Sequence, residues 1–88
     1  MIEDHHSIVK RFPTKGKEYK PGTVFLEAGN LGEICIILGK YEAKNETEHG
    51  ANMFRYSIVR FSSDDDTVTF HNFGWFLWED SEILFDPE

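Results

Sequence analysis

The segment between Phe73 and Asp80 carries four aromatic side chains and two carboxylates within eight residues. Tryptophan is enriched at protein–protein hot spots, because it removes a large area from water while its indole N–H can still donate a hydrogen bond. An exposed tryptophan surrounded by carboxylates would bind a basic partner by aromatic anchoring and electrostatic steering. The alternative is that both tryptophans fill the ends of the core. The candidate partner-binding residues are Trp75, Phe76, Trp78, Asp64, Asp65, Asp66, Glu79 and Asp80.

Catalytic and metal-binding chemistry has less support in the sequence. The one cysteine, Cys35, lies in a strongly apolar run, where a thiol is buried and inert rather than an activated nucleophile. His5 and His6 are adjacent and would point to opposite faces of an extended segment, and His49 and His71 have no spacing that links them. There is no nucleophile elbow and no glycine-rich phosphate loop. We therefore expect no enzyme activity, no metal site and no cofactor.

Charge is distributed unevenly along the 88 residues, whose formal net charge is −7. Residues 61–88 hold eight acids and no base, whereas residues 1–60 are close to neutral. A disordered acidic tail would be poor in aromatic residues, so we expect this acidic third to be folded. Its charge repels a phosphate backbone, which argues against direct nucleic-acid binding. The same carboxylates would suit a phage-type acidic mimic of nucleic acid that blocks a DNA- or RNA-processing enzyme.

Basic residues gather near the N-terminus, with Phe12 and Tyr19 between them. Such a segment can contact a phosphate backbone or stack on a base, but it is more often solvated or paired with the chain's own acids. We expect residues 1–20 to form a basic lead-in and residues 21–88 to form the folded domain. The five bases of this stretch are Lys10, Arg11, Lys15, Lys17 and Lys20.

Short β-type segments separated by turn residues follow the lead-in. Residues 33–38 form a continuous apolar run, which is typical of a strand covered on both faces. Residues 53–61 alternate in polarity, but Val59 and Phe61 interrupt the polar side, so the far side of this strand is expected to be partly covered too. Residues 75–80 suit a single helical turn. The expected strands are 23–27, 33–38, 53–61, 67–73 and 81–85.

The order of these segments resembles an SH3-like small β-barrel over roughly residues 21–86. The resemblance is carried by Pro21–Phe25, Gly32–Gly39, Tyr56–Phe61 and Glu82–Leu84. We therefore expect an all-β, five- to six-stranded SH3-like small barrel with a single-turn helix before the last strand. Such barrels host many functions, so the resemblance implies none in particular. Growth-inhibitor-type endoribonuclease toxins share this barrel class, but they would need a basic RNA groove, which the acidic C-terminal third contradicts.

The function expected from these features is a non-enzymatic protein-binding module or small inhibitor that engages a basic partner protein. Besides the nucleic-acid mimic, a further alternative is a structural subunit of a larger assembly, in which an apolar strip is a permanent contact. A single cysteine and the lack of a signal peptide predict a cytoplasmic location. No run of about 18 apolar residues occurs, which predicts no membrane span.

Overall fold

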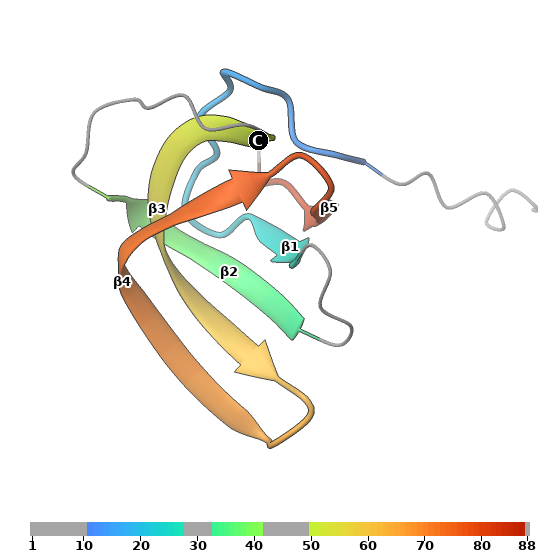
Figure 1. The fold of residues 1–88 in the computed structure, drawn as a ribbon, viewed down its shortest axis with the longest axis vertical. Helices are drawn as coiled ribbons and strands as arrows, with labels where there is room; N and C mark the ends of the chain where they lie inside the picture. Colours follow the sequence, from blue (N-terminus) through green and yellow to red (C-terminus); the bar gives the residue numbers. More distant parts are fainter. Residues whose placement is uncertain (1–10, 28–32, 42–49, 88) are drawn as a thin grey trace, which may run out of the picture.

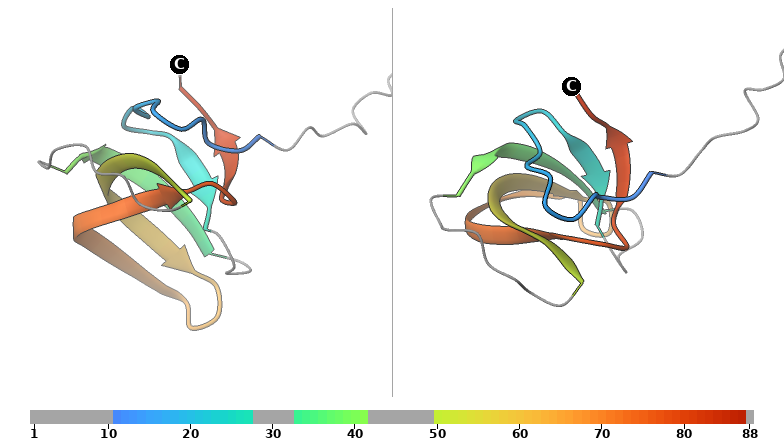
Figure 2. Two further views of the ribbon diagram at one scale, coloured as in Figure 1. Left: turned by 45° about the horizontal axis from the view of Figure 1, so that its top comes forward. Right: turned by 90° about the horizontal axis from the view of Figure 1, so that it is seen from above.

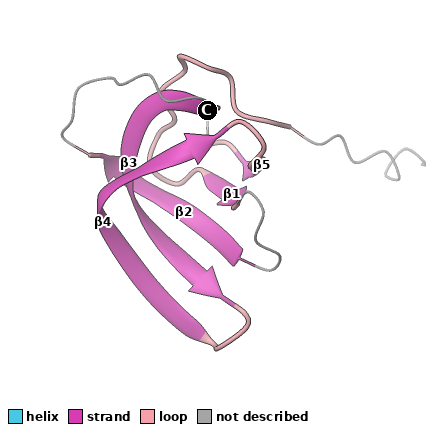
Figure 3. Ribbon diagram, viewed as in Figure 1, coloured by secondary structure: helices cyan, strands magenta, loops and turns pink. Residues whose placement is uncertain are grey.

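The computed structural model describes residues 11–27, 33–41 and 50–87, and for Phe73 the backbone alone. Within these residues the chain is all-β, as expected, and forms one antiparallel sheet in the order β4-β3-β2-β1-β5 (Figure 1; Figure 3). All five expected strands are present. They are β1 (Val24–Leu26), β2 (Glu33–Lys40), β3 (Ala51–Ser62), β4 (Thr67–Trp78) and β5 (Glu82–Phe85).

The helical turn expected at residues 75–80 is wrong. Gly74 has a φ of +87°, a left-handed conformation that glycine adopts without steric cost. The ladder with β3 shifts register at this point and then resumes, with Trp75 opposite Tyr56 and Phe76 opposite Arg55. Strand β4 therefore bends at Gly74 and continues to Trp78, and no helix occurs in the described residues.

The sheet is open within the part of the chain that the structure describes. Ladders join β4 to β3, β3 to β2, β2 to β1 and β1 to β5, but none of the described residues pairs β5 with β4. A single bridge between Arg11 and Ile83 extends the sheet by one residue beyond β5. The described residues contain no helix of the length and apolar character needed to cross a membrane.

The core lies on the inner, concave face of the sheet. Strands β3 and β4 are long and curved, and their bent halves arch over β1 and β2 (Figure 2). The buried residues of this core are Tyr19, Phe25, Cys35, Ile37, Tyr56, Ile58, Leu77 and Ile83.

The lead-in contributes directly to this core. Tyr19 is buried, and its backbone N–H donates a hydrogen bond to the hydroxyl of Tyr56 at 3.0 Å. Asn52, also buried, donates from its side-chain amide to the carbonyl of Lys17 at 2.7 Å and to the Tyr56 hydroxyl at 3.3 Å. Residues 11–20 thus pack against the strands, whereas residues 1–10 lie outside the described part of the chain.

Candidate functional site

The two tryptophans of the sequence-predicted site have different surroundings. Trp75 packs against the core, and its indole nitrogen is buried with no hydrogen-bond partner among the described residues. The guanidinium carbon of Arg60 lies 5.4 Å from the Trp75 ring centroid. The His71 ring centroid lies 4.7 Å from that of Trp75. Trp75 is therefore largely a packing residue.

Trp78 is exposed, whereas Phe76, like Trp75, is half-buried. Trp78 is 36% exposed and meets Phe76 edge-on, with ring centroids 5.9 Å apart. The guanidinium carbon of Arg55 lies 4.6 Å from the Phe76 ring centroid, a cation–π geometry. Phe76 and Trp78 together could anchor a partner, but the guanidinium of Arg55 already covers one side of the Phe76 ring.

The carboxylates of the predicted site do not form one rim. Asp64, Asp65 and Asp66 lie in the turn between β3 and β4, whereas Glu79 and Asp80 lie in the turn between β4 and β5. All five are exposed, and the twelve residues of β4 separate the two turns (Figure 1). A hydrogen bond from the Thr67 hydroxyl, 2.8 Å from Asp65, lowers the pKa of that carboxyl, with a further contribution from Ser62. The two acidic turns thus present separate charges at opposite ends of one strand.

The register of the sheet identifies a different surface on the side opposite to the core. Residues directly opposite one another on neighbouring strands point to the same side. Because Phe25, Cys35 and Ile58 point into the core, their neighbours along each strand point outward. One outward row reads Phe85, Val24, Ile36, Val59 and Phe70 across β5, β1, β2, β3 and β4. The β1–β5 ladder shifts register between Val24 and Phe25, so Phe85 is included for its pairing with Val24 and its exposure, not for alternation along β5. The next row reads Glu82, Leu26, Ile34, Phe61 and Val68 in the same strand order.

We call the ten residues of these two rows, together with Leu38, the outer face. Its side chains are apolar with one exception, Glu82 on edge strand β5. Several are strongly exposed: Phe70 is 71%, Val68 is 57% and Phe85 is 56% accessible. Val59, in the middle of the first row, is buried at 8% exposure, so the outer face is a largely apolar surface over the five strands whose exposed parts flank Val59.

Two hollows adjoin β4 on this side of the sheet. One, of about 340 Å³, is lined by Leu38, Phe70 and the polar side chains of Ser57 and Asn72, among others. The second, of about 250 Å³, is lined by the apolar residues Ile34, Phe61 and Val68 and by polar residues of the β3–β4 turn, among them Asp66. The outer face therefore combines a protruding aromatic side chain with depressions that are partly apolar and partly polar.

Sequence reasoning found the alternation in β4 but did not assign Val68 and Phe70 to a binding surface. They lie on the opposite side from Thr67, Thr69 and His71, as the alternation predicts. Their apolar side, however, is exposed rather than in the core. The signal that could have identified this surface is the apolar far side of β2 and β3, which carries Ile34, Ile36, Val59 and Phe61. From the sequence this side is expected to be covered.

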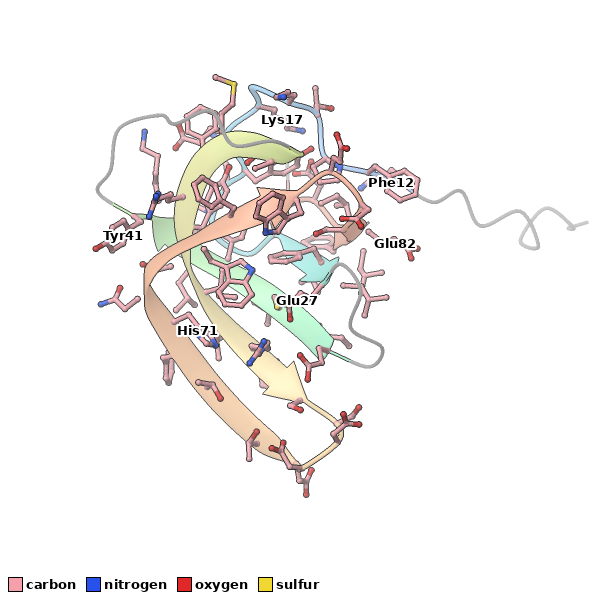
Figure 4. All side chains as sticks on the ribbon, viewed as in Figure 1. Phe12, Lys17, Glu27, Tyr41, His71 and Glu82 are labelled. Carbon is pink, nitrogen blue, oxygen red and sulfur yellow. The ribbon has the colours of Figure 1, made fainter. Side chains whose placement is uncertain are left out.

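A polar cluster occupies the inner face beside the core. The guanidinium of Arg60 lies 3.1 Å from a carboxylate oxygen of Glu27 and 3.4 Å from one of Glu33. Glu27 and His71 are labelled in Figure 4. Burial, followed by the charge of Arg60, lowers the pKa of His71. This cluster joins β1, β2 and β3 and is structural in character.

The described residues offer little for catalysis. Burial, and next the charge of Glu27, raises the pKa of Cys35 to about 12, so this thiol stays protonated. No group of three or more His, Cys, Asp or Glu side chains is placed to hold a metal ion in the described ranges. His5, His6 and His49 lie outside the described residues.

Comparison of the chain with protein-family models, curated proteins and solved structures gives no significant match.

Proposed function

We propose that this protein is a non-enzymatic protein-interaction module that binds its partner through the outer face. The observation that carries the proposal is the apolar character of two registered rows across all five strands. In a solvated antiparallel sheet, the side opposite to the core is normally polar. Exposed apolar patches of this extent mark interaction sites.

The outer face is a better candidate than the aromatic–acidic segment. Trp75 packs on the core, and the carboxylates are divided between two distant turns. By contrast, Phe70 and Val68 expose most of their side chains and have no packing role that would explain an apolar residue there. Binding that covers them would remove a large apolar area from water, which is the main favourable term in association.

For the fold we propose an SH3-like small barrel. The meander of β2, β3 and β4, the pairing of β5 with β1, and the strong curvature of β3 and β4 support this interpretation (Figure 2). In such a barrel the inner side of the sheet forms the core, and the outer side is available for binding.

The test replaces an outer-face side chain and follows binding. We expect Phe70→Ser to abolish co-purification of the partner from cells that make the protein, while the variant stays folded because Phe70 is exposed. Phe12→Ser is the matched control, since Phe12 is 54% exposed and lies on the lead-in, away from the β3–β4 hairpin (Figure 4). An unchanged set of bound proteins for Phe70→Ser, by quantitative mass spectrometry that also counts a differently tagged second copy of this chain, would contradict the proposal.

A further inference from the structure

The outer face carries a protrusion and a matching depression side by side. Phe70 projects from β4 with 71% of its surface accessible. A hollow of about 250 Å³ has the apolar side chains of Ile34, Phe61 and Val68 in its lining, and is completed by polar residues at the β3–β4 turn, which are Ser62, Ser63, Asp66 and Thr67. An apolar cavity of roughly 150 Å³ already accepts a benzene ring. A phenyl side chain from outside thus fits this hollow in size, and Ile34, Phe61 and Val68 offer it apolar contacts.

We propose that the occupant of the outer face is a second copy of this chain, in a two-fold symmetric dimer in which Phe70 of each copy enters the hollow of the other. This inference rests on the proposed function and names its partner. A two-fold interface uses the same patch on both subunits. If one residue of the first copy contacts another residue of the second copy, the same two residues are also in contact with the copies exchanged. A surface with both protrusion and hollow meets that requirement.

The size of the outer face agrees with a dimer interface. An apolar side chain of this size has a surface of about 200 Å². The summed accessible area of the exposed side chains is then roughly 600 Å² for Ile34, Leu38, Phe61, Val68, Phe70 and Phe85. Further area comes from the partly exposed side chains of Val24, Leu26 and Ile36. A stable interface covers about 800 Å² on each partner. The outer face supplies most of this area without any other part of the molecule.

The outer face carries little charge. Its single carboxylate, Glu82, lies on an edge strand. A second carboxylate, Asp66 of the β3–β4 turn, borders the hollow, whereas Glu79 and Asp80 lie in the turn at the other end of β4. Two largely apolar sheets can pack face to face about 10 Å apart, as in a β-sandwich.

Sedimentation of the full chain tests the dimer. We expect a species of twice the 10.2 kDa chain mass that dissociates on dilution between about 100 μM and about 1 μM. Phe70→Ser should raise the dimer dissociation constant at least about tenfold, as loss of a hot-spot aromatic does. Phe12→Ser should leave it unchanged.

Cross-linking tests the reciprocal contact. Phe70→Cys and Val68→Cys chains, mixed and oxidised, should form a mixed disulfide between two copies, identified by mass. Thr69→Cys points to the other side of β4 and should not cross-link. Cys35 stays out of the reaction because it is buried.

The outcomes separate the dimer from the proposed function. A wild-type chain that is monomeric at every concentration overturns the dimer, as does cross-linking no better than that of Thr69→Cys. If Phe70→Ser then still loses a co-purifying protein, the interaction module stands with a different partner. If it loses none, both proposals fall.

Discussion

Trp75 and Trp78 show that the same residue type, three positions apart on one strand, has different roles. We expect Trp75→Ala to lower the free energy of unfolding by about 3 kcal/mol, because its ring packs against the core. Trp78→Ala should lower it by about 1 kcal/mol, since part of that ring is already in water. Urea unfolding of both variants measures the difference. Equal losses would contradict the distinction between a packing and a surface tryptophan.

Cys35 predicts a loss of stability at alkaline pH. Its pKa is raised from 9.0 in the unfolded chain to about 12 in the fold. Above pH 9 the unfolded state therefore releases a proton that the folded state retains, so stability is fully present below pH 9 and falls as the pH rises. The expected slope is about 1 kcal/mol per pH unit up to roughly pH 11.

Urea unfolding across this pH range is the measurement, with Cys35→Ala as the control. The variant loses some packing at neutral pH but should show a smaller decline toward high pH. Part of the decline should remain, because burial also raises the pKa of Tyr56. If the two proteins decline in parallel, Cys35 does not carry the effect.

At the scale of elements, Arg60 fixes the β3–β4 hairpin to the rest of the sheet. Its ion pairs with Glu27 and Glu33 join β3 to residues beside β1 and on β2. We expect Arg60→Met to lower the free energy of unfolding by about 2 kcal/mol, because two half-buried carboxylates lose their partner. The combined variant Arg60→Met, Glu27→Gln, Glu33→Gln should recover much of this loss.

The exposed pair of Lys40 and Glu18 provides the comparison for that experiment. These side chains are 3.4 Å apart and largely solvated, so Lys40→Met should change the stability by less than about 0.5 kcal/mol. An equally small effect of Arg60→Met would show that the hairpin is held by the ladder alone.

The bend in β4 depends on Gly74. A Cβ atom at this position would lie 2.9 Å from Cδ of Arg55, and the φ of +87° is unfavourable for alanine. We expect Gly74→Ala to cost about 2 kcal/mol in chemical unfolding. Gly39→Ala is the control, because no atom lies within 4 Å of its Cβ position. Similar stabilities of the two variants would contradict this account of the bend.

The positions of the strands could be predicted from the sequence, but not which side of each strand faces the core. Turn residues and alternation located all five strands, because both signals are local. Alternation groups Val68 with Phe70 and Thr69 with His71, but it does not say which group meets the core. That choice depends on Arg60, Glu27 and Glu33, which gather on the inner side of the hairpin only in the folded sheet. The bend at Gly74 was missed for a similar reason, since a glycine signals a break without specifying its geometry.

The separation of the acidic turns could not be predicted from the sequence either. The sequence-based hypothesis places Asp64–Asp66 and Glu79–Asp80 around one aromatic surface. A strand of twelve residues separates the two turns, whereas the expected strand ended at residue 73 and was followed by a compact helical turn. The aromatic–acidic site therefore depended on a local structure that the chain does not adopt.

For the whole molecule, the net charge of −7 distinguishes the proposed dimer from the basic partner expected from the sequence. Two copies with this charge repel each other, and the outer face, whose one charged side chain is the carboxylate of Glu82, offers no ion pairs to offset the repulsion. A basic protein would instead be attracted. Added salt weakens both effects, because the screening length falls from about 10 Å at 0.1 M to about 3 Å at 1 M.

The two partners thus give salt effects of opposite sign. We expect the dissociation constant of the dimer to fall several-fold as sodium chloride rises from about 0.05 M to about 0.5 M, since screening removes the repulsion while apolar contacts persist. A complex with a basic protein would weaken over the same range. Sedimentation equilibrium at several salt concentrations measures the sign directly, with Asp64→Asn, Asp65→Asn, Asp66→Asn as a variant of reduced charge. At low salt, that variant should dimerise more tightly than the wild type, and at high salt the two dissociation constants should match. A wild-type dimer that weakens as salt is added would show that charge attraction, not the outer face, holds the copies together.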